Sequence, residues 1–417
     1  MSLARRLTLP DAVAIGLGAM MGAGVFAVWG PAVDAAGAGL WIALGVAAVV
    51  AFCNASSSAW LAATHPVSGG AYAFGRAELG PWWGYAAGWC FVIGKLASCA
   101  AMAMTFAAYV APPPFRSLVA ALAVVALTVV TCLGVTRTAR ATQALVVITI
   151  LGLALVVIAA GVALPAAAPA PLPDPTAYGV LQGAGLLFFA FAGYARIATM
   201  GEEVREPATT IPRAIAISLG GALGAYLLVG GAVALALGGD VTSSASPLAD
   251  VVAVAGWGPW ADTAVRIAAA TASLGALLAL LGGIGRTTLA MARESDLPRL
   301  LARIDPVHRV PRRAQLTAGG IVALVVLLTD LHGVIGFSSF GVLLYYAVAN
   351  LAAFSRYRSG SLRRRATAAG GTAGCLLLVL TLPPTSSAVG VAVLAAGLLL
   401  RVVRLRLSAG RRGTPTA

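Results

Sequence analysis

Residues 16–26 read GLGAMMGAGVF, so four glycines fall within one apolar stretch of eleven residues. Each glycine weakens a helix by up to about 1 kcal/mol relative to alanine. Inside a membrane, a broken helix is tolerated only where the freed main-chain groups are buried in protein or line a cavity. If the surrounding chain crosses a membrane, the stretch therefore predicts an interrupted helix beside a cavity.

The composition indicates that the chain does cross a membrane. Apolar residues make up 60% of the 417 residues and charged residues only 10%, whereas a soluble domain carries about 25% charged residues. Long runs of Ala, Leu, Val and Gly without alternation favour helices over a barrel. We predict an all-α integral membrane protein with about 12 transmembrane helices, at residues 9–35, 38–64, 79–111, 115–135, 141–164, 177–200, 211–238, 260–292, 313–331, 333–355, 366–383 and 386–405.

The net charge of +14 would suggest a nucleic-acid partner for a soluble protein. Here the basic residues cluster between apolar spans, and all but four of the 28 fall on one side if the N-terminus is cytoplasmic. The exceptions are Arg116 and Arg266 outside, and Lys95 and Arg196 within spans. The positive-inside rule predicts a plasma-membrane protein with both termini cytoplasmic and no nucleic-acid partner. A single lysine among the basic residues suggests a GC-rich bacterial genome.

A second weak point lies in the sixth predicted span, where residues 189–194 read FAFAGY. Two interrupted helices at corresponding positions of two halves point to the binding site of a transporter. The start of a half-helix offers N–H groups to a carboxylate, and its end offers carbonyl groups to an ammonium group. The alternative is that Gly22 and Gly24 only allow neighbouring helices to pack closely.

Five segments carry a family resemblance. They are MMGAGVF at 20–26, PVSGGAYAFGR at 66–76, FFAFAGYARIATMGEEVREPATTIPRAI at 188–215, GRTTLAMARESDLPRLLARIDP at 285–306 and SSFGVLLYYAVANLAA at 338–353. In this order and spacing they resemble the amino acid–polyamine–organocation permeases.

The resemblance implies a leucine-transporter-type fold with two five-helix inverted repeats, 9–164 and 177–355. Two accessory helices at 366–405 would follow, with a cytoplasmic N-terminus at 1–8 and a basic, flexible tail at 406–417. The substrate carboxylate would meet main-chain N–H groups in the first helix, and the amino group would meet carbonyls of both breaks. The implied substrate-binding residues are Met20, Gly22, Ala23, Gly24, Phe189, Ala190, Ala192 and Gly193.

Four charged residues are candidates for coupling or gating. Lys95 lies near the middle of the third span, where a cation costs about 2.5 kcal/mol or more. It could face the cavity as a substitute for sodium or as a proton carrier, or pair permanently with helix-end carbonyls. Arg196 could reach an inner gate or pair with Glu202 or Glu203, which would otherwise form a solvated helix end. Many family members have an acidic residue where this chain has Ala195, so a mechanism using that carboxylate is in doubt.

We therefore expect a secondary amino acid permease that works by alternating access, with a neutral amino acid favoured as substrate. A charged Lys95 would shift that preference towards an acidic one. Proton coupling and exchange both stay open, as does the oligomeric state. The alternatives are a carrier of polyamines or ethanolamine-like amines, a channel, or a non-transporting receptor. Neither a nucleotide-binding loop nor a metal-ligand spacing such as HExxH occurs, so we expect neither an enzyme nor a cofactor.

Overall fold

The computed structural model describes residues 7–65, 69–134, 139–163, 169–198, 200, 203–358 and 360–412. These residues fold as helices, joined by loops that contain two isolated β-bridges, Leu7 to Val204 and Ala170 to Gly238. The helices are α1 (Leu9–Met20), α2 (Ala23–Ala27), α3 (Trp29–Ala36), α4 (Leu40–Thr64), α5 (Ala71–Leu79), α6 (Pro81–Val110), α7 (Arg116–Cys132), α8 (Ala139–Ala163), α9 (Ala177–Phe191), α10 (Ala195–Ala198), α11 (Pro207–Leu237), α12 (Pro247–Val254), α13 (Pro259–Arg293), α14 (Arg312–Leu328), α15 (Leu331–Arg356), α16 (Leu362–Thr381) and α17 (Pro384–Arg412).

The structure has a helix at every predicted span, which confirms an all-α protein with multiple membrane crossings. Ten of the spans in the described part of the chain are long and apolar enough to cross a membrane. The other two predicted spans coincide with α14, which has 17 residues, and α16, which carries three arginines in its first turn. The rest of each helix is mainly apolar, and both helices pack beside the longer spans.

Three parts of the helical structure were not predicted. The predicted loops before the third and eighth spans contain α5 and α12, of nine and eight residues, which are too short to register as spans. Helix α5 buries both Tyr72 and Phe74, so tertiary packing stabilises it. The segment from Arg406 was predicted to be a flexible tail, but α17 continues to Arg412.

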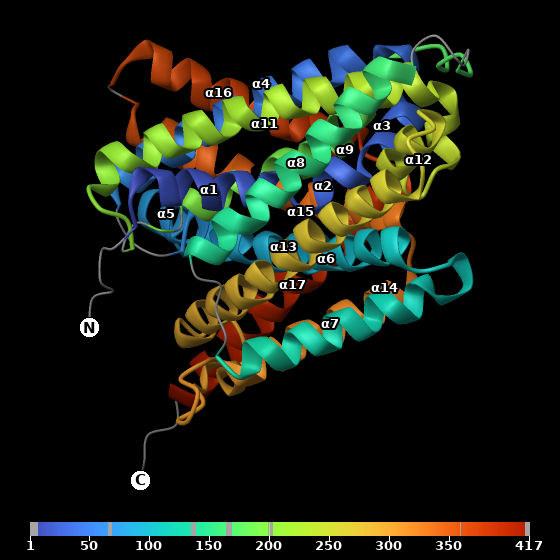
Figure 1. Ribbon diagram of the computed structural model, residues 1–417. Helices are drawn as coiled ribbons and strands as arrows, with labels where there is room; N and C mark the ends of the chain where they lie inside the picture. The colour runs from blue at the N-terminus through green and yellow to red at the C-terminus, as the bar shows by residue number, and fades with distance from the viewer. Residues whose placement is uncertain are drawn as a thin grey trace.

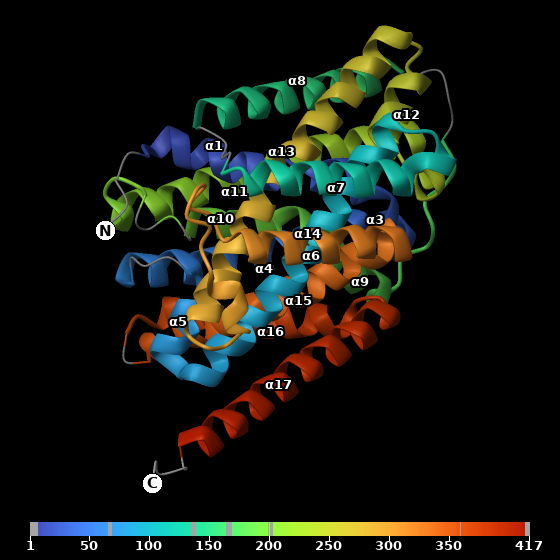
Figure 2. The same cartoon turned by 90° about the horizontal axis from the view of Figure 1, so that it is seen from below.

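The long helices run roughly side by side, with α6 packed between α13 and α15 (Figures 1 and 2). Helix α7 packs along α14, although nearly two hundred residues separate them in the sequence. Helix α17 lies at the edge of the bundle (Figure 2). The first turn of α1 and the last turns of α17 lie at the same end of the bundle, as an even number of crossings requires (Figure 1).

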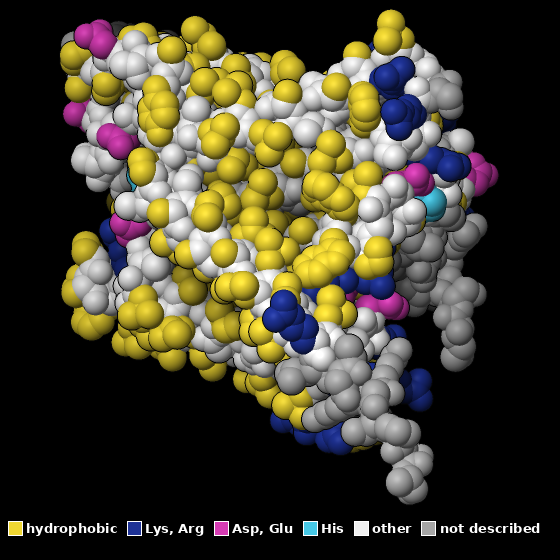
Figure 3. Space-filling model, turned by 180° about the vertical axis from the view of Figure 1, so that it is seen from behind, with side chains coloured by type: hydrophobic (Ala, Val, Ile, Leu, Met, Phe, Trp, Pro, Cys, Tyr) yellow, Lys and Arg dark blue, Asp and Glu magenta, His cyan; other side chains and the backbone are white. Residues whose placement is uncertain are grey.

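The outer surface is apolar across the middle of the molecule. Figure 3 shows hydrophobic side chains over the centre of one face, with charged side chains gathered towards its edges. Ile42, Leu151 and Leu380 are 64%, 65% and 77% exposed, respectively. In water, this surface would be a large exposed apolar patch, but it suits a protein surrounded by lipid.

Candidate functional site

The first predicted crossing is interrupted inside its glycine-rich stretch. Helix α1 ends at Met20, and Gly22 leaves helical geometry with a ψ angle of −136° before α2 begins at Ala23. The first N–H groups of a new helix have no partner within that helix. A new helix therefore begins in the middle of the bundle, within the stretch where the sequence predicted an interruption.

The sixth predicted crossing is interrupted more gently. After α9, residues 192–194 form a single 3₁₀ turn, and the four-residue α10 follows. The two interruptions touch each other. A Cβ atom on Gly193 would lie 2.4 Å from the main-chain carbon of Ala19, and one on Gly24 would lie 2.8 Å from the Cα of Ala190. These glycines thus serve close packing as well as the interruptions, so both sequence interpretations apply.

A cavity of about 240 Å³ lies beside the two interruptions. Six of the predicted substrate-binding residues line it: Met20, Gly24, Phe189, Ala190, Ala192 and Gly193. Gly22 and Ala23 do not line it; a Cβ atom on Gly22 would instead lie 2.8 Å from the Cβ of Ala276 on α13. Most of the remaining wall comes from α6 and α13, with contributions from α5, α8 and the loop residues Gly69 and Glu203, so segments distant in sequence build one chamber.

Main-chain carbonyls at the interruptions already accept hydrogen bonds from side chains. The Tyr226 hydroxyl on α11 lies 2.8 Å from the Met20 carbonyl oxygen and 2.9 Å from that of Ala190. It can donate its one proton to either and thereby ties the two interruptions together. The Tyr346 hydroxyl on α15 lies 3.4 Å from the Ala192 carbonyl oxygen. The carbonyls predicted to bind a substrate amino group are therefore shared with protein donors.

Lys95 faces the cavity and also contacts an interruption. Its side chain is 7% exposed and lines the cavity from the middle of α6. The Nζ atom donates to the Ala192 carbonyl oxygen at 3.3 Å. The contact with the Ala192 carbonyl fits the alternative in which Lys95 pairs permanently with helix-end carbonyls. Its position in the cavity wall fits the alternative in which Lys95 substitutes for sodium or carries a proton.

One end of the cavity reaches a group of charged side chains. Arg196, Glu203 and Arg286 line it there, and Arg286 lies 3.9 Å from the Glu203 carboxylate. Arg196 also interacts electrostatically with Glu203, which is one of the two partners predicted for it. Glu202, the other predicted partner, lies outside the described residues. Glu203 and Arg286 are partly exposed, so this end forms the mouth of the cavity.

The opposite end is closed by buried packing. The Tyr109 hydroxyl donates to the Phe26 carbonyl oxygen at 3.1 Å and accepts from the Leu248 N–H at 3.3 Å. The rings of Phe26 and Tyr109 meet edge to face, and both side chains are fully buried. Within the described part of the chain, the cavity is therefore accessible at the end beside Glu203 and Arg286, and buried packing covers the end beyond Gly24.

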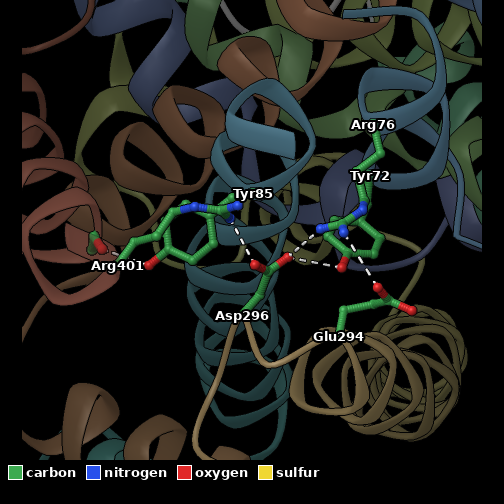
Figure 4. Close-up of polar contacts among 7 residues, drawn as sticks. Tyr72, Arg76, Tyr85, Glu294, Asp296 and Arg401 are labelled. Carbon is green, nitrogen blue, oxygen red and sulfur yellow. Dashed lines mark hydrogen bonds and ion pairs between the residues drawn. The ribbon is translucent and has the colours of Figure 1, made fainter. Parts of the chain in front are cut away.

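A second group of charges, which we call the Asp296 cluster, lies beside the mouth (Figure 4). Its members are Tyr72, Arg76, Glu294, Asp296 and Arg401. The Asp296 carboxylate accepts hydrogen bonds from Tyr72 at 2.9 Å, Arg76 at 3.0 Å and Arg401 at 2.7 Å. Burial, together with the adjacent Asp296 carboxylate, raises the pKa of Tyr72, so its hydroxyl stays protonated and donates. Tyr72 also lines the cavity, so the cluster links α17 to the cavity wall.

Sequence reasoning missed Tyr226, Arg286 and the Asp296 cluster. Tyr226 is one of few polar side chains within the apolar span at 211–238, a signal that can suggest a buried contact but names no partner. Arg286 and Asp296 both fall within the segment 285–306 that supported the family resemblance. Their partners are distant in the sequence, so no local spacing could identify them.

Comparison with known proteins agrees with this architecture. A family model for amino acid permeases matches residues 7–402. An uncharacterized transporter of Mycobacterium tuberculosis is 51% identical over 416 residues, covering 99% of this chain and 94% of the relative. Mouse cationic amino acid transporter 4 is 30% identical over 83% of this chain and 58% of its own length. The branched-chain amino acid permease BcaP of Bacillus subtilis is 28% identical over 84% of this chain and 80% of its own length.

These matches confirm the predicted resemblance to amino acid–polyamine–organocation permeases, which are transporters and not enzymes. They show that this chain belongs to the amino acid permease family and is a multi-pass membrane transporter of that family.

Proposed function

We propose that this protein is a secondary carrier that moves amino acids with uncharged side chains by alternating access. The observation that carries the proposal is a cavity that lies beside two touching helix interruptions and, among the described residues, opens at one end. A channel must open to both sides at once, whereas a carrier exposes its site to one side at a time. The arrangement corresponds to one such state.

The wall of the cavity supports an uncharged side chain as the preferred substrate group. Its apolar lining includes Ile15, Met20, Phe91, Met102, Phe189 and Leu280. Burying an aliphatic side chain against such a surface is worth about 1.5–3 kcal/mol. Polar lining in the middle of the cavity is restricted to small groups and Lys95. BcaP, one of the relatives, is named for branched-chain substrates, which fit this lining.

We further propose that the open end faces the cytoplasm. The N-terminal end of α1 and the C-terminal end of α17 lie at that end of the bundle (Figure 1). Basic side chains also gather there, including Arg286, Arg299, Arg303, Arg356 and Arg404. Cytoplasmic loops carry such an excess of basic residues. The described state is then inward-open. The first and sixth crossings, which contain the interruptions, would rock around the site to reach the outward-open state.

Uptake into proteoliposomes tests the proposal. Vesicles loaded with unlabelled leucine should accumulate external labelled leucine by counterflow, and the rate should saturate. A panel of neutral, acidic and basic amino acids, putrescine and ethanolamine as competitors defines the substrate class. A flux that grows linearly with concentration would indicate a channel, and no flux of any amino acid or amine would overturn the carrier proposal. Preferred competition by putrescine or ethanolamine would favour an amine carrier.

A further inference from the structure

Lys95 is a cation in a cavity whose lining has few negatively charged groups to neutralise it. Glu203 is the one carboxylate among the described residues that line the cavity, and it lies at the mouth beside Arg286 and Arg196. Around Lys95, its own helix contributes the uncharged residues Phe91, Ser98 and Met102 to the cavity wall, and the facing interruption contributes Ala192, whose carbonyl accepts from Lys95. The lining described here thus carries more positive than negative charge, and its deepest charge is an ammonium group.

The main-chain carbonyls that could bind a second cation are shared with protein donors. The Ala192 carbonyl accepts from Lys95 and lies within reach of Tyr346. The carbonyls of Met20 and Ala190 share the hydroxyl of Tyr226. A cationic side chain entering this chamber would therefore share these carbonyls with protein donors, and it would still meet the Lys95 charge.

We propose that Lys95 is a specificity-determining residue whose ammonium group rejects amino acids with cationic side chains. The proposal rests on the proposed carrier function and deepens it by naming the excluded substrate class. A neutral zwitterion can set its carboxylate against Lys95, so its net interaction with that charge is small. A lysine or arginine substrate adds a second positive charge with no acidic partner.

The size of the effect follows from Coulomb's law. Two like charges about 5 Å apart in a medium of effective dielectric constant about 20 repel strongly enough to lower affinity by roughly two orders of magnitude. We therefore expect cationic amino acids to bind about a hundredfold more weakly than neutral amino acids of the same shape. Loss of the Lys95 charge should remove most of that difference.

Arginine and citrulline provide the sharpest test because they are nearly isosteric and differ in side-chain charge. In proteoliposomes with the full chain, citrulline should compete with labelled leucine about a hundredfold better than arginine. The Lys95→Met and Lys95→Gln variants should bring the ratio to within about fivefold. Lys95→Arg should keep it. Cys99→Ala is the matched control, because Cys99 is buried one turn further along α6 and does not line the cavity.

The ratio separates this role from a purely structural one. If Lys95 only holds the Ala192 carbonyl, both neutral variants should lose transport of every substrate equally, with an unchanged citrulline-to-arginine ratio in thermal-shift binding. Equal competition by arginine and citrulline in the unmodified protein would overturn the proposal without any variant. That result would leave the carrier function standing, whereas no uptake of any amino acid would remove the function itself.

Discussion

Two buried charges of this protein differ in how they are neutralised. The side chains of Lys95 and Asp296 are 7% and 6% exposed, respectively. Asp296 accepts bonds from Tyr72 and two arginines, which leaves its carboxylate fully partnered (Figure 4). Lys95 donates to one main-chain carbonyl and faces a cavity. A charge that is neutralised within the protein serves the fold, whereas one that faces a cavity is available to a ligand.

The largest expected effect concerns the fully partnered charge. Asp296→Ala should lower the free energy of unfolding by about 3–5 kcal/mol, because it leaves the buried Arg401 without its carboxylate. Unfolding in detergent micelles, followed by circular dichroism, measures the change. The control is Glu294→Ala, whose partly exposed pair with Arg76 should cost less than about 1 kcal/mol. Similar losses for the two variants would remove the distinction between the two charged regions.

The position of Ala192, the partner of Lys95, depends on the neighbouring glycine. Gly193→Ala should cost about 1–3 kcal/mol of stability and reduce leucine counterflow at least tenfold, because the new methyl group would meet the main chain of Ala19 and Met20 within 2.6 Å. Gly220→Ala in α11 is the control, since a Cβ atom there meets nothing within 4 Å. If Gly193→Ala transports normally, close contact between the interruptions is not required for function.

A substitution of Tyr226 tests whether its hydrogen bonds to the Met20 and Ala190 carbonyls stabilise the site around Lys95. Tyr226→Phe keeps the ring, which meets Phe191 edge to face, but removes the donor shared by Met20 and Ala190. We expect a loss of about 1–2 kcal/mol in unfolding free energy, the usual cost of leaving a buried acceptor unpaired. Tyr178→Phe, at a half-exposed position, is the control and should change little. An unchanged stability for Tyr226→Phe would mean that the two carbonyls find other donors.

The comparison also indicates how far the sequence can predict this molecule. Hydropathy and charge bias located the helices, since the length of a membrane span and the sidedness of arginines are local properties. The glycine cluster at 16–24 located the first interruption for the same reason, and the FAFAGY segment at 189–194 located the second. The partners of Asp296 were not predictable, because Arg401 lies 105 residues away and the contact depends on how α17 packs. Lys95 was recognisable as unusual, but its contact with Ala192 required the tertiary structure.

The ion pair between Glu203 and Arg286 at the cavity mouth is more exposed than either Asp296 or Lys95. We expect its loss to have the smallest effect of the predicted changes. Glu203 and Arg286 are 30% and 52% exposed and 3.9 Å apart, so Glu203→Gln should change unfolding free energy by less than about 1 kcal/mol. It removes the carboxylate nearest to Arg196 and Arg286, so the mouth becomes more positive. Half-saturation for glutamate should then fall about two- to threefold at low salt, with the difference lost at high salt, where exposed charges are screened. A salt-independent change would mean that Glu203 acts on the buried part of the cavity, where water and ions do not reach, and would place it with Lys95.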